Sequence, residues 1–317
     1  MSRVLVLSEA EVEDLFPMAE AIRVMEEALT ALARGEVEQP LRSKLIPADA
    51  PGLLGLMPAW RGGAKPVFGL KEVCVFPGNP ARGLDTHLGA VLLHSGETGE
   101  LLGVMNAAAI TAIRTAAVSA VATRLLARPE ASRLAIIGAG VQARKHLEAM
   151  RCVRKIKQVK VFSRSGARGL GSEAASAEEA VADADIIVTA TSAREPVLGQ
   201  ESVRPGTHIN AVGSSVPGAR ELSSALVASA SLFVDRREST VRESGDYLFA
   251  VKDGAIGGPE HIKGEIGDLL LGTVPGRQSK DEVTLFKSLG LAIEDVAAAA
   301  FLYEKATRLG KGTRVEF

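Results

Sequence analysis

From residue 134 to residue 235 the chain alternates short apolar runs with stretches of helical period. Five of these runs are almost continuously hydrophobic: Leu134–Ile137, Val159–Phe162, Ile186–Thr189, His208–Val212 and Leu232–Asp235. Strands that are buried on both faces have this character, and the strand–helix–strand rhythm places such strands in one parallel sheet. The pattern therefore predicts an α/β domain in this part of the chain.

The first third of the chain follows a different pattern. A short N-terminal strand is followed by Ser8 and Glu11, which have the spacing of a helix capping box. The apolar positions after Pro17 alternate in steps of four and three, which predicts a second, amphipathic helix. This helix ends at Gly35. Beyond it, Val67–Val75, Ala90–His94 and Leu101–Met105 predict strands of a mostly antiparallel sheet.

Two longer helices are predicted outside these regions. The helical period runs from about Thr111 to Leu126, just before the parallel strands, and again from about Leu289 to Leu309. The chain has 317 residues, enough for two domains.

Composition and charge exclude several classes of protein. Lysine and arginine number 37 against 38 acidic residues, so a net charge of −1 gives no footprint of a general nucleic-acid binder. No run of about 18 apolar residues predicts a membrane span, and the N-terminal apolar run is too short for a signal peptide. We therefore expect a cytoplasmic protein that binds neither nucleic acid nor membrane.

The metal-binding residue types are few and scattered. Cys74 and Cys152 are too few for a disulfide framework or a four-cysteine zinc site, and we expect both to be buried thiols. None of the five histidines has the spacing of a metal ligand pair. We expect no metal site.

A glycine-rich turn follows the first parallel strand. Leu134–Ile137 leads directly into Gly138-Ala139-Gly140-Val141-Gln142-Ala143, and a helix follows. Gly138 permits the tight turn, Gly140 lets the backbone approach a pyrophosphate, and the helix N-terminus favours its charge. A plain glycine turn is the alternative, but the flanking strand and helix favour a dinucleotide site.

The second parallel strand carries information about which dinucleotide binds. An Asp or Glu after this strand would bind the ribose 2′-hydroxyl of NAD, whereas this chain has Ser163-Arg164-Ser165. A guanidinium flanked by hydroxyls suits a 2′-phosphate, although a solvated loop arginine is the alternative. We expect NADPH, with NADH possible.

Three basic residues of the first domain stand in or beside apolar sequence. Arg42, Lys71 and Arg114 need anionic partners if they are buried, because an unpaired buried cation is costly. Ion pairs with Glu72 or Asp85 would satisfy them, and so would an anionic ligand.

At this point the chain resembles a known family, the ornithine cyclodeaminase/mu-crystallin family. The resemblance covers nearly the whole chain and is carried by an ordered set of motifs: Pro40-Leu41-Arg42, Leu56-Met57-Pro58-Ala59, Gly69-Leu70-Lys71, Pro77-Gly78-Asn79, Ile113-Arg114-Thr115-Ala116-Ala117, the glycine turn at 138–143, Ile209-Asn210-Ala211-Val212-Gly213 and Phe286-Lys287-Ser288-Leu289-Gly290. The family includes cyclodeaminases, alanine and related amino-acid dehydrogenases, and NAD(P)H-dependent ketimine reductases.

The resemblance implies a fold and a domain layout. A Rossmann-type dinucleotide-binding domain over 113–291 is joined to a smaller α+β substrate and dimerisation domain built from 1–112 plus 292–317. It also implies a homodimer.

The resemblance implies the roles of individual residues as well. Arg42 and Arg114 would anchor a substrate carboxylate, Lys71 would supply the proton, and Met57 and Ser215 would contact the substrate. Cofactor contacts would come from Thr86, His87, Arg114, Thr115, Gly138, Ala139, Gly140, Val141, Gln142, Ser163, Arg164, Ser165, Thr191, Val212 and Ser288. Independently of the resemblance, the place of Asp295 on the last helix, after Ser288-Leu289-Gly290, predicts that it caps or pairs across domains.

Departures from the family pattern choose between its branches. Ser215 stands where cyclodeaminases carry an Asp, and Gly55 stands where they tend to carry a Glu. A serine hydroxyl cannot deprotonate a distal ammonium, so these positions favour the ketimine-reductase branch. The segment Gly166–Ser176 is also short, and it predicts a truncated second crossover.

The resulting prediction is NAD(P)H-dependent reduction of a C=N bond beside a carboxylate. Cyclic ketimines such as Δ1-pyrroline-2-carboxylate and Δ1-piperideine-2-carboxylate are the expected substrates. The alternatives are an alanine-type amino-acid dehydrogenase, an ornithine cyclodeaminase, and a mu-crystallin-like protein that binds NADPH and a small carboxylate without turnover.

Overall fold

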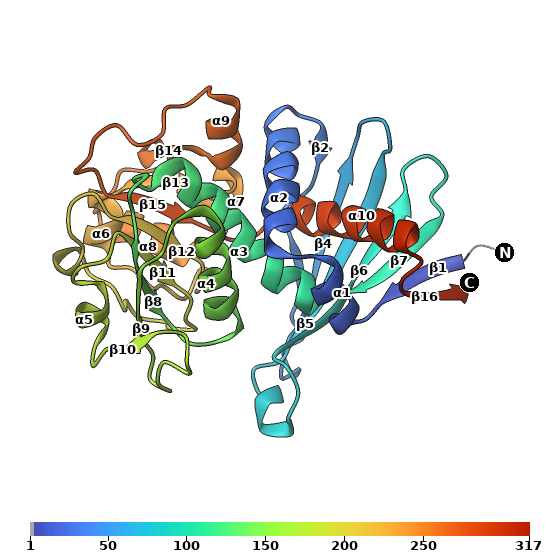
Figure 1. Ribbon diagram of the computed structural model, residues 1–317, viewed down its shortest axis with the longest axis horizontal. Helices are drawn as coiled ribbons and strands as arrows, with labels where there is room; N and C mark the ends of the chain where they lie inside the picture. The colour runs from blue at the N-terminus through green and yellow to red at the C-terminus, as the bar shows by residue number, and fades with distance from the viewer. Residues whose placement is uncertain (1–2) are drawn as a thin grey trace. The chain divides into compact units, whose positions relative to one another are not determined.

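The computed structural model describes residues 3–317, which fold as two compact units (Figure 1). Unit 1 comprises Met1–Arg114 and Leu291–Phe317, and unit 2 comprises Thr115–Gly290. The chain enters unit 2 within helix α3 (Ala107–Leu126) and returns just before helix α10 (Ala292–Leu309). The boundaries at 114/115 and 290/291 lie within two residues of the expected ones.

Unit 1 is built on an eight-stranded sheet. Its order is β16-β1-β7-β6-β5-β4-β2, with β3 paired to β4. The strands are β1 (Arg3–Leu7), β2 (Val37–Glu38), β3 (Ser43–Leu45), β4 (Leu53–Arg61), β5 (Val67–Val75), β6 (His87–Ser95), β7 (Leu101–Asn106) and β16 (Thr313–Glu316). β4 to β7 pair antiparallel, as expected, while β1 and β7 are parallel.

The predicted N-terminal helices are present. Helix α1 (Glu9–Leu15) begins with the capping box, because Ser8 accepts from the amide of Glu11 while the Glu11 carboxylate accepts from the Ser8 amide at 2.8 Å. Helix α2 (Met18–Ala33) buries the apolar stripe. Figure 1 shows α2 and α10 lying across the same face of the sheet.

Strand β4 was not predicted, because Pro58 lies within it. Proline cannot donate a backbone hydrogen bond and is confined to positions where none is needed. On the side of β4 away from β5, β3 pairs with Leu54–Leu56 and β2 pairs with Trp60 and Arg61. Pro58 lies between these two short partners, so the strand can contain it.

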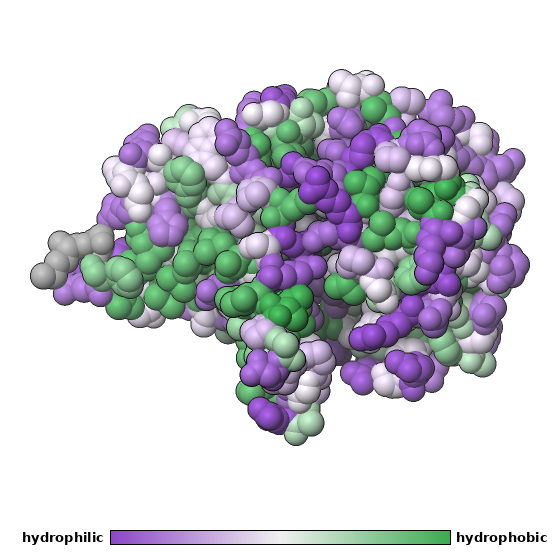
Figure 2. Space-filling model, turned by 180° about the vertical axis from the view of Figure 1, so that it is seen from behind, coloured by the Kyte–Doolittle hydropathy of each residue, from purple (hydrophilic) through white to green (hydrophobic). Residues whose placement is uncertain are grey.

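The two faces of this sheet differ. Directly opposite residues of antiparallel strands point the same way, so Lys71, Met57 and Val91 share the buried face that packs against α10. The alternate positions form the open face, which also carries Glu72 and His94. Its apolar residues are Leu45, Leu54, Leu56, Pro58, Trp60, Phe68, Leu70, Cys74, Leu88, Ala90, Leu92 and Val104. These side chains are exposed or half-buried, and Figure 2 shows hydrophobic residues gathered over the strands of unit 1.

Unit 2 is an eight-stranded, wholly parallel sheet of order β10-β9-β8-β11-β12-β15-β13-β14. The strands are β8 (Arg133–Ile137), β9 (Gln158–Phe162), β10 (Ser172–Glu173), β11 (Ile186–Thr189), β12 (His208–Ala211), β13 (Ser231–Val234), β14 (Ile262–Glu265) and β15 (Thr284–Lys287). The helices are α4 (Val141–Val153), α5 (Ala177–Val181), α6 (Ser224–Ser229), α7 (Arg237–Glu243), α8 (Gly245–Lys252) and α9 (Ile266–Leu271). The five predicted strands and their parallel arrangement are confirmed, and the α/β fold class with them.

The short segment after β9 contains no helix. The chain runs from Phe162 to the two-residue strand β10 through a loop in which Arg168 and the glycines at 166 and 169 have positive φ. β10 still pairs parallel with β9. The crossover is therefore reduced to a turn-rich loop.

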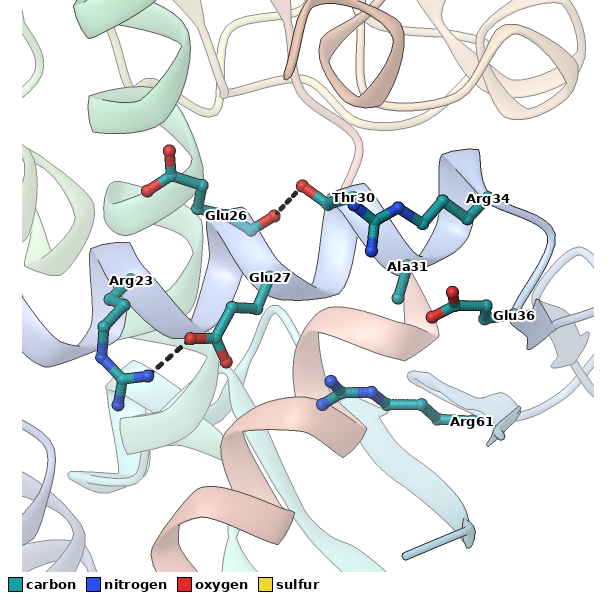
Figure 3. A pocket seen from close by; sticks show the side chains of 8 residues that line it. All are labelled: Arg23, Glu26, Glu27, Thr30, Ala31, Arg34, Glu36 and Arg61. Carbon is teal, nitrogen blue, oxygen red and sulfur yellow. Dashed lines mark hydrogen bonds and ion pairs between the residues drawn. The ribbon is translucent and has the colours of Figure 1, made fainter. Parts of the chain in front are cut away.

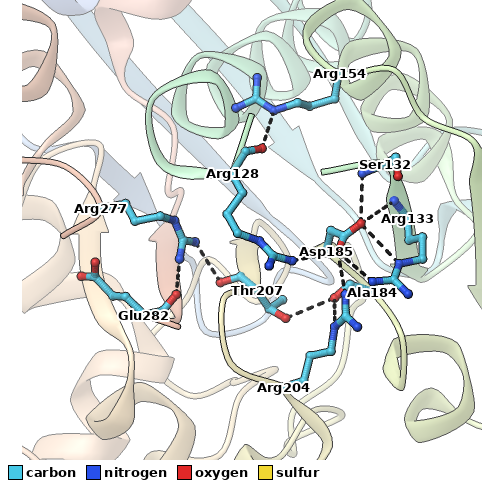
Figure 4. A network of polar contacts seen from close by, with 10 residues as sticks. All are labelled: Arg128, Ser132, Arg133, Arg154, Ala184, Asp185, Arg204, Thr207, Arg277 and Glu282. Atoms are coloured by element: carbon cyan, nitrogen blue, oxygen red, sulfur yellow. Dashed lines mark hydrogen bonds and ion pairs between the residues drawn. The ribbon is translucent and has the colours of Figure 1, made fainter. Parts of the chain in front are cut away.

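A cluster of arginines gathers at the amino edge of the parallel sheet (Figure 4). Asp185, just before β11, accepts from Arg128, Arg133 and Arg204 and from the amides of Ser132 and Arg133. Although burial opposes its ionisation, these hydrogen bonds lower the pKa of Asp185 to about 2. This carboxylate ties together the amino ends of β8, β11 and β12.

Helix α3 is long and apolar enough to cross a bilayer by length and composition alone, but 83% of its most apolar window is buried inside the protein. Its burial is that of a core helix.

Candidate active site

Two buried cations of unit 1 share one carboxylate. Lys71 Nζ lies 2.7 Å from Asp295 Oδ2, and Arg114 Nε donates to Asp295 Oδ1 at 3.1 Å. Arg114 Nη1 also donates to Glu294 Oε2 at 2.5 Å. Lys71 Nζ donates further to the Thr111 hydroxyl at 3.4 Å. All four charged side chains are at least 95% buried.

Local structure brings the two acids over Lys71. Gly69 lies two residues before Lys71 on the same face of β5, and a Cβ there would come within 2.5 Å of Val296. The missing side chain lets α10 approach the strand closely. The amide of Ile293, at the start of α10, donates to Gln39 Oε1. Glu294 and Asp295 occupy the first turn of α10, where the helix dipole favours negative charge.

This environment changes the acidity of both cations. Burial lowers the pKa of Lys71 to about 8 against the attraction of Asp295, and the charges of Arg114 and Arg42 lower it as well. Arg114 is also buried, but Asp295 and Glu294 raise its pKa. An amine with a pKa near 8 can both hold and release a proton close to neutral pH.

Lys71 and Arg114 pair with acids other than Glu72 and Asp85, the two that the sequence offered as alternative partners. Their partners are acids at least 180 residues further along the chain, and no local spacing points to such a pairing. Asp295 pairs within unit 1 and not across domains.

The other predicted substrate residues of unit 1 lie in the same region. Met57 is directly opposite Lys71 on β4 and is 6% exposed. Arg42 is half-buried just before β3, close enough for its charge to lower the pKa of Lys71. Thr86 and His87 stand where β6 begins, and His87 is exposed. Unit 1 thus brings Arg42, Met57, Lys71 and Arg114 together.

Unit 2 carries the glycine turn at the carboxyl end of β8. Gly138 has φ +116°, and a Cβ there would lie 2.4 Å from the Ala190 carbonyl oxygen, so glycine is required. Gly140 has open space around it and begins α4 with no side-chain cap on the helix amides. The Gln142 Oε1 atom is buried with no hydrogen-bond partner in residues 3–317. These features fit a pyrophosphate at this helix terminus.

Three buried charged residues, Glu221, Lys287 and Asp246, hold the loops beside this turn. No pattern in the sequence predicted this role. Glu221 accepts from the Thr189 hydroxyl and from both the amide and the hydroxyl of Thr191 at 2.7–2.8 Å. Lys287 Nζ pairs with Asp246 at 2.7 Å and donates to the Gly213 carbonyl at 2.8 Å. The Thr191 hydroxyl therefore donates its hydrogen bond to Glu221.

The remaining predicted residues of unit 2 lie on these loops or near them. Val212 and Ser215 belong to the loop after β12, where Ser214 has a strained φ of +52°. The buried Ser288 donates its amide to the Ala211 carbonyl, and Thr115 is buried in α3. Ser163, Arg164 and Ser165 follow β9, where the Ser163 hydroxyl accepts from the Ser165 amide and Arg164 is exposed.

A separate pocket of about 440 Å³ lies on the solvent side of α2 (Figure 3). Three arginines and three glutamates line it: Arg23, Arg34, Arg61, Glu26, Glu27 and Glu36. Arg23 pairs with Glu27 at 2.6 Å. The charges balance, and no predicted site residue lines this pocket. In residues 3–317 no group of His, Cys, Asp and Glu side chains could hold a metal ion.

Comparison with known proteins places this site in a family. The model of the ornithine cyclodeaminase/mu-crystallin family matches residues 3–310. The chain is 40% identical to ketimine reductase mu-crystallin of Mus musculus, covering 94% of this chain and 96% of the relative. The chain belongs to this family, and the predicted resemblance is confirmed.

Two solved structures share the fold over nearly the whole chain. Delta(1)-pyrroline-2-carboxylate reductase of Thermococcus litoralis, in complex with NADH and L-proline, superposes with TM-score 0.95 at 38% identity, covering 98% of this chain and all of the other. An archaeal alanine dehydrogenase dimer with bound NAD superposes with TM-score 0.93 at 38% identity, covering all of both chains. These relatives confirm the predicted enzyme class, an NAD(P)H-dependent oxidoreductase acting on C=N bonds.

Proposed function

We propose that this protein reduces a C=N bond adjacent to a carboxylate at the expense of NADPH or NADH. Cyclic ketimines such as Δ1-pyrroline-2-carboxylate and Δ1-piperideine-2-carboxylate are its substrates. The observation that carries the proposal is the buried ammonium of Lys71, held beside Arg114 with a pKa of about 8. The relatives that act on ketimines and on pyrroline-2-carboxylate support it.

The residues of unit 1 supply the acid–base part of this reaction. Arg114 holds Asp295 through Nε and Glu294 through Nη1, and through Nη2, together with Arg42, it binds the substrate carboxylate. A bound reduced nicotinamide supplies the hydride that the imine carbon accepts. The Lys71 ammonium gives its proton to the imine nitrogen, which leaves a neutral secondary amine and a neutral lysine. Lys71 regains a proton from solvent before the next turnover.

A cofactor-consumption panel tests the proposal. NADPH and NADH oxidation are followed with each cyclic imine, and with pyruvate and other oxo acids in the presence and absence of ammonia. We expect multiple turnovers with the preformed cyclic imines and none with oxo acids alone. Sustained turnover only with an oxo acid plus ammonia would establish the second candidate, an amino-acid dehydrogenase, which the alanine dehydrogenase relative favours.

Two further outcomes would overturn the proposal in other ways. Release of ammonia from ornithine with no net change in reduced cofactor would identify a cyclodeaminase, which Ser215 and Gly55 disfavour. Tight binding of NADPH and imine with no repeated turnover would identify a binding protein.

The loop after β9 favours NADPH in this proposal. Arg164 is exposed between two serines, and no acidic residue stands beside it to repel a phosphate. We expect Arg164→Ala to raise the KM for NADPH by about 10- to 100-fold, because a charged hydrogen bond contributes about 1.5–3 kcal/mol. The KM for NADH should stay the same. Arg242→Ala removes an equally exposed arginine of α7 as the control, and equal losses for both cofactors would refute the assignment.

We also propose that two chains form a homodimer through the open face of the unit 1 sheet. This face carries exposed apolar side chains across four adjacent strands, among them Leu45 at 63%, Phe68 at 50% and Leu88 at 42% exposure. Monomeric proteins rarely leave so large an apolar surface in water. An archaeal relative of the same fold was solved as a dimer.

Both cysteines are free, which fits the reducing cytoplasm proposed for the protein.

Phe68→Glu tests this interface. An unpaired charge buried among the apolar side chains of this interface is expected to cost at least about 2 kcal/mol, which raises the dimer Kd by about 30-fold or more. Sedimentation velocity over a range of concentrations measures the change. Leu309→Glu alters a side chain of similar exposure at the end of α10 and should leave the dimer intact. A wild-type monomer at micromolar concentration would end the proposal.

A further inference from the structure

Resting on the proposed function, we propose that Asp295 is the positioning residue that aims the Lys71 side chain and keeps it an ammonium, so that Asp295 sets the alkaline limit of imine reduction. Asp295 does not itself exchange a proton with the substrate. It acts through Lys71.

The geometry assigns this role to one carboxylate. Each oxygen of Asp295 faces a different cation, with Oδ2 at 2.7 Å from Lys71 Nζ and Oδ1 at 3.1 Å from Arg114 Nε. The Asp295 side chain has no exposed surface. One rigid group therefore fixes both the proton donor and the carboxylate anchor, and their separation is set by the width of a carboxylate.

The charges around Lys71 make Asp295 decisive. The Lys71 ammonium faces Arg114 and the Thr111 hydroxyl on α3, Arg42 in the segment before β3, and His87 on β6. Glu294, the neighbouring acid on α10, bonds to Nη1 of Arg114. Asp295 is thus the carboxylate in direct contact with the Lys71 ammonium. The positive charges of Arg114 and Arg42, and of His87 when it is protonated, disfavour that ammonium.

Removing the charge should therefore deprotonate Lys71. In Asp295→Asn the shape is kept, but burial and the two arginines act on the lysine with less opposition. The proton donor would then be lost at a lower pH. A residue that merely supports the fold would instead lower activity equally at every pH.

The pH profile of kcat/KM tests this prediction. In Asp295→Asn we expect the alkaline limb for cyclic imine reduction to move down by at least about one pH unit, so that activity falls about fivefold or more relative to wild type at pH 8 and much less at pH 6. Glu294→Gln is the matched control, because the Glu294 carboxylate bonds to Arg114 at the next position of α10; the change should raise KM and leave the limb in place. Asp295→Glu, which restores the charge, should move the limb back toward the wild-type position.

A readout that needs no activity separates this inference from the proposed function. The protonation of Lys71 is followed by NMR of the ¹³Cε-labelled lysines, with the Lys71 signal assigned from Lys71→Arg. We expect its midpoint to fall in Asp295→Asn. If the wild-type protein reduces no imine but the midpoint still falls, the proposed function is wrong and the positioning role stands.

An unchanged Lys71 midpoint in folded Asp295→Asn overturns the inference. Thermal melting reports whether this variant folds. If it does not, the midpoint is measured in Asp295→Ala, which also removes the charge that faces Lys71, and an unshifted midpoint there overturns the inference as well.

Discussion

Lys71→Met is expected to lower kcat/KM for cyclic imine reduction by about 10²- to 10⁴-fold at pH 7. A positioned general acid contributes about that much to a proton-transfer step. Methionine fills a similar volume and carries neither charge nor proton, and the change leaves Asp295 paired with Arg114. Steady-state rates with saturating NADPH measure the loss.

The control for this prediction is an exposed lysine of the same unit. Lys65 is 81% exposed and pairs with Glu304, so Lys65→Met should leave the rate unchanged. NADPH binding, followed by fluorescence, should persist in Lys71→Met because the glycine turn belongs to unit 2. A rate for folded Lys71→Met within about threefold of wild type would remove Lys71 from the chemistry.

The same lysine predicts opposite pH profiles for the two directions of the reaction. Imine reduction needs the ammonium, so kcat/KM should decline as the pH rises through the Lys71 pKa of about 8. Oxidation of the cyclic amine needs Lys71 as a neutral amine that can accept the proton, so the rate of oxidation should increase over the same interval. The sign follows from the direction of proton transfer alone.

The parts of the fold that obey local rules could be predicted from the sequence. The capping box at Ser8, the continuous apolar strands and the glycine turn at Gly138 each depend on neighbouring residues only. Each was found where its pattern placed it. The parallel sheet followed because buried strands joined by helices have few other arrangements.

Other strands escaped prediction because their patterns are weak or contradictory. β4 contains Pro58, which normally argues against a strand, and only the gap between β2 and β3 makes it acceptable. β14 and β15 are four residues long and contain lysine. The buried Lys287 of β15 is tolerated because Asp246 pairs with it.

The candidate site shows the same division. Lys71 and Arg114 were recognised because a cation in apolar sequence needs a partner, but the partner was misplaced. Glu294 and Asp295 come next to Lys71 only because Gly69 admits α10, a packing event between segments more than 220 residues apart. No local sequence pattern signals this packing of α10 against β5. A separate expectation was also wrong: Cys152 was expected to be a buried thiol, and it is exposed.

The largest stability effect is expected at Asp185. Asp185→Asn should lower the free energy of unfolding by about 2–3 kcal/mol at pH 7, because it takes from three arginines the carboxylate that they share. For a unit of this size that corresponds to a fall in Tm on the order of 10 °C. Calorimetry of the wild type and the variant measures it. Asp183→Asn, an exposed acid two residues earlier, should change Tm by little.

The pH dependence identifies the mechanism. The folded pKa of Asp185 is depressed to about 2, below its ordinary value of 3.8, so its stabilisation is complete above pH 3.8 and is lost as the pH falls through 2. The stability difference between the wild type and Asp185→Asn should therefore shrink between pH 4 and pH 2, as measured by denaturant unfolding. A difference that persists unchanged to pH 2 would show that packing, and not the ionised carboxylate, holds this edge of the sheet. Because Asp185 lies at the amino edge and the glycine turn at the carboxyl edge, Asp185→Asn should still bind NADPH at 25 °C.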